Sequence, residues 1–366
     1  MLEIIVPCAR GLEGLVRAEL ESLGVERCQE QPGAVRGAGS WPEVRRVNRW
    51  SRCGRRVLVG LADWPAVDAA MLAGGLRDVV RRDPGIREVL APERSLSVHA
   101  SASRSRLRDG RAIAGIVREA IGEAQEVAFG RRAAVEPHGA DLPLRVRIHK
   151  DLATLLLDTS GWPLDGRRGP EEPGEPRRTV CAALLAASGW DGVGDVVDPF
   201  AGDGRVLEEV ADALAERPPG RRELWPWQGL AGEGEVATGG APRGALPDGL
   251  TLHAGSVDQR EVRTLRSWAQ QEGLPVRARH THLDQLAAPS EAGLVISAPG
   301  SLSPKRWGQL GTALKHRFPG WRAALLCPGD AWKTLALKPS RTLRVKDGEL
   351  DATIVALELW AGRKDW

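Results

Sequence analysis

The chain has 366 residues, 42% of them apolar, and a formal net charge of +3 at pH 7. This length allows two or three domains with hydrophobic cores, and no run of about 18 apolar residues predicts a membrane-spanning helix. The five cysteines are scattered and form no C-x-x-C pair, which argues against a disulfide framework and a zinc knuckle. The N-terminus has no long apolar stretch, so we expect no secretory signal and a cytoplasmic protein.

The first 160 residues predict a mixed α+β region. The stretch L-E-I-I-V-P reads as a short strand, and apolar residues at helical spacing predict a helix over residues 11–24. Further along we expect helices at 63–80 and 112–124, and strands at 55–63, 95–101, 144–149 and 153–157. The last two strands should form an antiparallel pair.

Two arginine clusters stand out in this half, R-R-V-N-R-W-S-R-C-G-R-R at 45–56 and R-S-R-L-R-D-G-R at 104–111. Local clusters suit phosphate contacts better than a uniform positive field does. A solvated arginine-rich face explains them equally well. The candidate phosphate-binding residues are Arg45, Arg46, Arg49, Arg52, Arg55, Arg56, Arg104, Arg106, Arg108 and Arg111.

The segment 166–176, dense in proline, glycine and charge, predicts a domain boundary. After it, helices are expected at 178–188, 206–214, 258–271 and 306–316, and strands at 193–198, 250–254, 275–280, 293–297 and 321–326. Residues 217–250 read as an insertion rich in Pro, Gly and Trp. The alternation of strand and helix predicts an α/β domain with a doubly wound parallel sheet.

The stretch V-V-D-P-F-A-G-D-G-R at 196–205 lies at the first strand-to-helix turn of this sheet, where such folds bind ligands. Gly202 and Gly204 would let a ligand approach the backbone, and Asp198 could hold a cation or hydroxyls. No Walker lysine is present, and Leu207 replaces the third glycine of a dinucleotide fingerprint. The remaining D-P-F-x-G-x-G pattern is typical of S-adenosylmethionine methyltransferases, although a plain strand-to-helix turn stays open.

Longer stretches of the sequence add support to the interpretation of this pattern as a methyltransferase motif. They are L-D-T-S-G-W-P-L at 157–164, R-G at 168–169, A-A-L-L-A-A-S-G-W-D-G at 182–192, and the opening C-A-R-G-L-E-G-L-V-R-A-E-L-E-S-L-G. Together with the glycine loop they resemble the THUMP-domain RNA guanine-N2 methyltransferases, in particular the bacterial large-subunit (23S) rRNA enzyme. The resemblance covers essentially the whole chain.

The resemblance implies a Rossmann-like class I methyltransferase domain preceded by an α+β ferredoxin-like and THUMP region that binds RNA. We expect a ferredoxin-like piece at 1–55, a THUMP domain at 56–160, a linker and helix at 161–190, and the methyltransferase domain at 191–366. In such enzymes S-adenosylmethionine gives its methyl group to the exocyclic amine of a guanine. The implied partner is rRNA or tRNA, and no membrane or metal is expected.

Carried over to this sequence, the family's cofactor motif gives Asp198, Phe200, Gly202 and Gly204. Glu209 matches a helix glutamate that more often supports structure. The remaining cofactor positions diverge. Where the family has an acid at the second strand end, this chain has Ser256, with Asp258 two residues later. Where the family has an aspartate facing the adenine, it has His282, with Asp284 two residues on.

Strand alternation would leave His282 and Asp284 on one face of the third strand, so Asp284 could partly substitute for the family's aspartate. His280 shares that parity. Because no third ligand is evident, we expect no metal at this place.

The fourth motif differs most. The family's N-P-P-Y supplies an acceptor for the target amine and a ring that stacks on the flipped base. This chain reads V-I-S-A-P-G at 295–300, which would put Ser297 and Pro299 at the catalytic positions and Gly300 in place of the ring. A one-residue shift of the alignment would put Ala298 and Ser301 there instead, and either way the amide and the ring are missing. Trp307 could supply a ring from the next segment.

These differences leave two hypotheses. The first is an active RNA methyltransferase with a remodelled site, supported by the intact glycine loop and domain order. The second is a degenerate paralogue that binds RNA, in ribosome assembly or regulation, without methyl transfer. Losses at three strand ends support the second.

Overall fold

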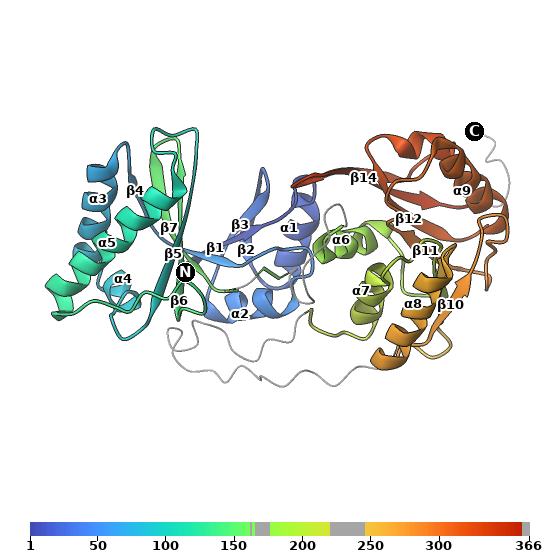
Figure 1. Ribbon diagram of the computed structural model, residues 1–366, viewed down its shortest axis with the longest axis horizontal. Helices are drawn as coiled ribbons and strands as arrows, with labels where there is room; N and C mark the ends of the chain where they lie inside the picture. Colours follow the sequence, from blue (N-terminus) through green and yellow to red (C-terminus); the bar gives the residue numbers. More distant parts are fainter. Residues whose placement is uncertain (162, 165–175, 220–245, 361–366) are drawn as a thin grey trace.

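The computed structural model describes residues 1–161, 163–164, 176–219 and 246–360. The predicted linker at 166–176 therefore falls almost wholly outside the described residues, as do Trp225, Trp227 and most of the expected insertion. Two seven-stranded sheets lie one after the other along an elongated molecule (Figure 1). No helix in the described ranges is both long and apolar enough to cross a membrane.

The first sheet has the strand order β2-β3-β1-β4-β7-β6-β5, antiparallel except for the β5–β6 pair. Strand β4 pairs with both β1 and β7, so the two N-terminal bodies share one continuous sheet. The expected division at residue 55 falls just before β4. The strands are β1 (Leu2–Pro7), β2 (Glu26–Gln31), β3 (Ala34–Gly39), β4 (Leu58–Pro65), β5 (Leu96–Ser103), β6 (Leu142–His149) and β7 (Leu152–Asp158).

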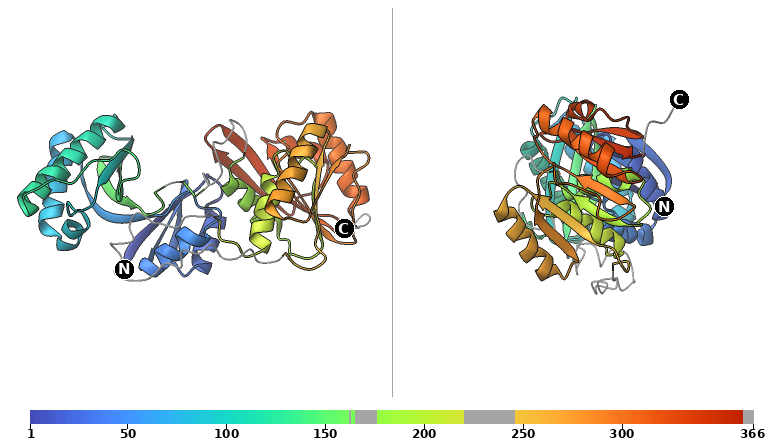
Figure 2. Two further views of the ribbon diagram at one scale, coloured as in Figure 1. Left: turned by 60° about the horizontal axis from the view of Figure 1, so that its bottom comes forward. Right: turned by 90° about the vertical axis from the view of Figure 1, so that its right-hand side faces the viewer.

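Five helices belong to this half, and α3 and α5 lie at the end farthest from the second sheet (Figure 2). They are α1 (Glu13–Ser22), α2 (Trp41–Trp50), α3 (Ala69–Arg82), α4 (Pro84–Val89) and α5 (Gly110–Phe129). Their apolar sides share one core with alternate strand residues such as Ile4 and Val59. Because strand side chains alternate, Ile5 and Leu58 point to the opposite face, where they form a separate small cluster.

The second sheet has the order β10-β9-β8-β11-β12-β14-β13. Strands β8 to β12 pair in parallel, as the sequence predicts. Two strands that the sequence analysis did not predict extend one edge, where β14 runs antiparallel to β12 and forms a hairpin with β13. The strands are β8 (Asp195–Asp198), β9 (Leu252–Ser256), β10 (Val276–His280), β11 (Gly293–Ser297), β12 (Arg322–Pro328), β13 (Arg341–Asp347) and β14 (Leu350–Glu358).

Helices cover both faces of this sheet. On one face α6, α7 and α8 join the core that continues from the N-terminal half, and on the other α9 and η1 form a second core. The helices are α6 (Arg178–Ser188), α7 (Arg205–Leu214), α8 (Gln259–Glu272), α9 (Pro304–Arg317) and the 3-10 helix η1 (Ala331–Leu335).

The N-terminal body contacts the second sheet through its β13–β14 hairpin. Arg10 and Lys346 exchange two backbone hydrogen bonds of 3.0 Å. The next residue, Gly11, has φ +92°, and a Cβ there would lie 1.7 Å from the carbonyl oxygen of Arg344. Only glycine fits this junction, because it accepts the left-handed backbone and has no side chain to clash.

Candidate functional site

The candidate cofactor site lies where the strand order of the second sheet reverses. From β8 the chain continues outward to β9 and β10, and it then returns to β11 on the other side of β8. Parallel sheets of this kind bind ligands at such a switch point, outside the carboxyl ends of the strands. Asp198 ends β8 and Ser297 ends β11, so the structure brings these two predicted residues together.

The glycine loop joins β8 to α7. Gly202 and Gly204 have φ of +51° and +84°, and Gly204 is the N-cap of α7. No atom lies within 4 Å of the position that a Cβ on Gly202 would take, so the loop opens to space there. A ligand can therefore reach the backbone beside the N-terminus of α7.

Asp198 is 1% exposed and has one engaged carboxylate oxygen. Oδ1 accepts hydrogen bonds from the Ser297 hydroxyl (2.5 Å) and the Phe200 backbone N–H (3.0 Å). Oδ2 is buried and has no hydrogen-bond partner within the described part of the chain. Burial raises the pKa of Asp198 to about 7, although both hydrogen bonds oppose the shift. One oxygen thus stays available to a cationic group.

Ser297, expected at the catalytic position, is 0% exposed, and its hydroxyl donates to Asp198. Pro299 is half-buried beyond the strand end, and Gly300 is exposed with φ +60°. The suggestion that Trp307 supplies the missing ring is wrong, because Trp307 is 1% exposed and packs into the core under α9.

The sequence analysis missed a carboxylate beside the end of β9, that of Glu261 on α8. The hydroxyl of Ser256, at the position of the family's acid, donates to Oε2 of Glu261 at 2.5 Å and accepts from the Asp258 backbone N–H at 2.9 Å. Asp258 is the N-cap of α8, and its own side chain accepts from the Arg260 backbone N–H. The available signal was an acid in the first turn of α8, since one turn brings Glu261 back over the strand end.

An aromatic ring and a guanidinium lie together at the same edge. Phe200 follows β8, and the Arg306 guanidinium from the first turn of α9 lies 5.5 Å from the centroid of its ring. Arginine and aromatic planes both stack on nucleobases. Sequence reasoning assigned Phe200 to the cofactor and did not find Arg306, because the spacing along the chain does not place α9 over β8.

The end of β10 differs from the expectation. The strand ends at His280, and His282 and Asp284 lie in an exposed turn in which the Gln285 N–H donates to the His282 carbonyl oxygen. The argument from strand alternation is therefore wrong, because it needs a strand through residue 284. The rings of His280 and His282 meet edge to face at 5.1 Å. No group of three metal-ligating side chains occurs among the residues that the structure describes.

The first arginine cluster divides into two groups. Arg52, Arg55 and Arg56 bind carboxylates of other elements, namely Glu209 (2.7 Å), Asp347 (3.0 Å) and Asp158. Arg45, Arg46 and Arg49 lie on α2, where Arg46 contacts Glu43 and Arg49 lies over the Trp50 ring. The first group thus holds the fold together, and RNA binding by the second group stays a prediction.

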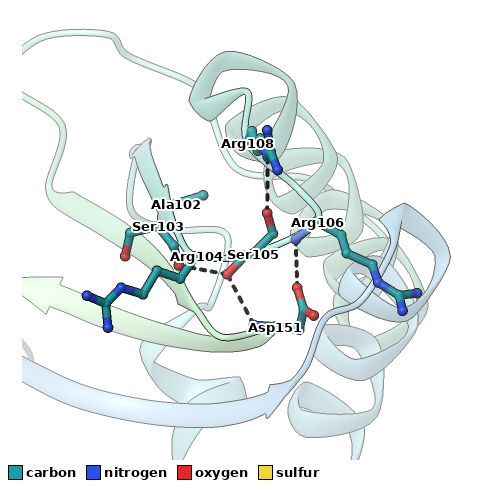
Figure 3. A pocket seen from close by; sticks show the side chains of 7 residues that line it. All are labelled: Ala102, Ser103, Arg104, Ser105, Arg106, Arg108 and Asp151. Atoms are coloured by element: carbon teal, nitrogen blue, oxygen red, sulfur yellow. Dashed lines mark hydrogen bonds between the residues drawn. The ribbon is translucent and has the colours of Figure 1, made fainter.

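The second arginine cluster lines a hollow of about 450 Å³ between the end of β5 and the β6–β7 turn (Figure 3). Asp151 accepts from the Arg106 backbone N–H at 2.8 Å, and its own N–H donates to the Ser105 hydroxyl at 3.1 Å. These bonds hold the loop so that Arg104, Arg106 and Arg108 surround the hollow, with Arg104 at φ +51°. Arg111 follows in the first turn of α5.

Comparisons with known proteins fit this architecture. Residues 3–58 match the RlmL ferredoxin-like domain. The chain is 28% identical to the candidate RNA methyltransferase slr0064 of Synechocystis, over 96% of the chain and 95% of that protein. It is also 28% identical to the ribosomal RNA large subunit methyltransferase K/L of Stutzerimonas stutzeri, over 98% of the chain and 53% of that enzyme. The chain is thus similar in sequence to the K/L methyltransferases along nearly its whole length.

The chain spans about half the length of the K/L enzyme. Solved structures agree on the fold. SMU.472 with S-adenosylhomocysteine bound has a TM-score of 0.84, 22% identity and 99% coverage of both chains. TrmN from Thermus thermophilus has a TM-score of 0.71, 19% identity and coverage of 98% of this chain and all of that one. The methyltransferase fold and the resemblance to the K/L family are confirmed.

Proposed function

We propose that the chain is an RNA methyltransferase that uses S-adenosylmethionine and acts on N2 of a guanine in rRNA or tRNA. The buried, unpartnered Oδ2 of Asp198 at the switch point carries this proposal. A buried carboxylate without a partner is unfavourable unless a ligand completes it. An ammonium group, such as the one on the methionine part of the cofactor, fits that need.

The residues around Asp198 fit the rest of the cofactor. Glu261, held by Ser256, would accept the ribose hydroxyls from the end of β9. Asp258, His282 and Asp284 remain candidates for the ribose and adenine edges. When bound, S-adenosylmethionine supplies an activated methyl group. The protein's own contribution would be to orient the reactants at the edge of the sheet and to exclude water.

The target base would lie at the Phe200–Arg306 pair, which offers a stacking surface at the rim. RNA would reach it through Arg45, Arg46 and Arg49 on α2 and through the arginine hollow at the end of β5. We therefore assign RNA binding to the ferredoxin-like and THUMP parts, 1–55 and 56–160. Methyl transfer belongs to 191–366.

A specific observation also favours the second candidate, a paralogue that binds RNA without catalysis. The family's acceptor for the target amine is replaced by Ser297, whose hydroxyl is fully buried and bonded to Asp198. Loss of such an acceptor can remove about 3 kcal/mol of transition-state stabilisation.

Calorimetry with S-adenosylmethionine tests the cofactor site directly. The wild-type chain should bind, Asp198→Asn should weaken binding by at least about tenfold, and Asp248→Asn, an exposed change before β9, should bind as wild type. Absence of binding at millimolar cofactor contradicts the enzyme. If the cofactor binds, mass spectrometry of rRNA and tRNA from a deletion strain should show one missing methylguanosine. An unchanged profile selects the paralogue without catalysis.

A further inference from the structure

A second basic hollow lies on the face of the first sheet that the helices leave open. It has a volume of about 300 Å³, and its lining comes from β1 and β3 on one side and from β5, β6 and β7 on the other. Its position is where the ferredoxin-like and THUMP parts meet through β4. We infer that this hollow binds one nucleotide of single-stranded RNA, which adds a contact to the RNA binding proposed above and rests on it.

The floor of the hollow is apolar. Ile5, Leu58 and Leu156 are 4%, 6% and 4% exposed, and with Ala34 they form a cluster separate from the main core. Ile5 lies opposite Leu58 in the strand register, and Leu156 lies opposite Arg145. An apolar floor between polar walls suits the face of a nucleobase, which proteins commonly hold against apolar side chains.

The walls are cationic. Arg36 lies on one side, opposite Ile5 in the register, and Arg145 and Arg147 lie on the other. Among the described residues that line the hollow there is no aspartate or glutamate. Arg36 and Arg145 are held in place by Glu3 and Asp158, whereas the exposed Arg147 has no ion pair or side-chain hydrogen bond in the described ranges. Arg147 is therefore free to contact a phosphate.

Hydroxyl groups accompany this arginine. Ser101 and Thr154 flank Arg147 in the strand register, one on each neighbouring strand, and both line the hollow. Hydroxyls on the strands that flank a phosphate-binding arginine can hydrogen-bond the sugar or the phosphate oxygens. The apolar floor thus matches the base of one nucleotide, the arginine matches its phosphate, and the hydroxyls match its ribose.

His99 reports on the electrostatics of the wall. It lies opposite Arg145, and partial burial together with Arg145 and Arg56 lowers its pKa, while Asp158 acts in the opposite direction. The local potential is thus positive before any ligand arrives. A bound phosphate would favour the protonated ring, so RNA should raise the pKa of His99.

The test measures the affinity of the full chain for a labelled single-stranded RNA by fluorescence anisotropy. Arg147→Glu should weaken binding by at least about tenfold and lower the slope of log affinity against log salt by about 0.7, as expected for one lost phosphate contact. The matched control is Arg118→Glu on α5, an exposed arginine on the helix-covered side of the same sheet. Equal affinity of the two variants overturns the inference.

A second measurement tests the base. The same RNA backbone with abasic residues should bind the wild-type chain at least about fivefold more weakly, because contacts with the base face are lost. Equal affinity for both RNAs means that only the backbone is bound, which overturns the nucleotide site. The imidazole signals of His99, followed by NMR, should shift to a higher pKa with the base-bearing RNA, and an unchanged pKa contradicts it.

Failure of this hollow is distinguishable from failure of the proposed function. If Arg147→Glu behaves as Arg118→Glu while Arg106→Glu in the other hollow weakens binding, the inference is wrong and RNA binding stands. If the wild-type chain binds no RNA, both are wrong. Cofactor binding by calorimetry reports on the methyltransferase site independently of either outcome.

Discussion

Asp198 and Ser297 form a unit whose members are 99 residues apart in the chain. The serine hydroxyl fixes one oxygen of the carboxylate, and the other is buried with no hydrogen-bond partner in the described part of the chain. In the family pattern this position would contact the target base, whereas the Ser297 side chain contacts Asp198, which we propose as a cofactor ligand. The substitution therefore changes what the residue contacts, in addition to removing an amide.

The Asp198 carboxyl should make cofactor affinity depend on pH near neutrality. Its pKa of about 7, raised from 3.8 by burial, means that only the chain above that pH carries the anion. Affinity for S-adenosylmethionine should be highest above pH 7. Below pH 7 it should fall about tenfold per pH unit, because the ionised fraction of Asp198 falls by that factor. Calorimetry from pH 5 to pH 9 measures this, and a flat profile contradicts the pairing.

The same pKa predicts the sign of a stability effect. Between pH 3.8 and about 7 the folded chain holds a proton that the unfolded chain has released, so this group lowers stability as pH rises through that window. Asp198→Asn keeps the hydrogen-bond acceptor without the charge. At pH 8 it should raise the melting temperature by a few degrees, as expected for a gain of about 1–3 kcal/mol in the free energy of unfolding. At pH 4 it should have little effect. A lower melting temperature at pH 8 contradicts the argument.

Ser297→Ala separates support of Asp198 from direct catalysis. Loss of the hydroxyl removes a hydrogen bond that lowers the pKa of Asp198, so the midpoint of the pH profile for cofactor binding should move upward. Affinity at pH 7 should then fall by about threefold to tenfold. Ser267→Ala, an exposed change on α8, is the control. An unmoved midpoint shows that Ser297 does not act through Asp198.

At the scale of elements, α7 links the glycine loop to the N-terminal body. Arg52, in the segment after α2, bonds Glu209 at 2.7 Å and also reaches the carbonyl oxygens of Asp212 and Arg217. Burial raises the pKa of Glu209, and Arg52 opposes that shift. Helix α7, which begins directly after the glycine loop, is thus anchored from outside its own domain.

Breaking this anchor should be strongly destabilising. Arg52→Met leaves Glu209, 4% exposed, as an unpaired buried carboxylate, and should lower the free energy of unfolding by about 3 kcal/mol. Arg81→Met removes an exposed pair with Asp78 and should change it by less than about 1 kcal/mol. Denaturant unfolding measures both. Adding Glu209→Gln to Arg52→Met should recover part of the loss, since it removes the buried charge.

Helices with a clear apolar face were predicted well, whereas several strands were missed, including the apolar β14. Helix α6 begins and ends where the sequence predicts, at Arg178 and Ser188. Strand β2 was missed because it is short and polar with only Cys28 buried, and β3 was missed because its alanines and glycines are poor strand formers. The expected helix at 63–80 starts late. Strand β4 continues to Pro65 through its pairing with β7, and Asp68 caps α3 by accepting from the Met71 N–H.

At the scale of the whole molecule, the N-terminal half and the second sheet follow one another along the long axis (Figure 1). We propose that RNA runs along the first toward the second. The arginines of the β5 hollow should contribute mainly through phosphates. Replacing Arg104, Arg106 and Arg108 by alanine should lower the salt slope of RNA affinity by about 2, at about 0.7 per phosphate contact on a single strand. Anisotropy at several salt concentrations measures the slope. A slope equal to that of the wild type contradicts phosphate binding there.

The sequence by itself determined the doubly wound sheet and the glycine loop, because both rest on local periodicity and on residues adjacent in the chain. The methyltransferase fold followed from the resemblance to a known family. Only the tertiary structure decided what the polar residues do. It directed Arg52, Arg55 and Arg56 to internal carboxylates, buried Trp307, brought Glu261 to Ser256, and bonded Ser297 to Asp198. Hydrogen bonds and ion pairs act over a few ångströms in space, and the packing of distant elements sets which groups come that close.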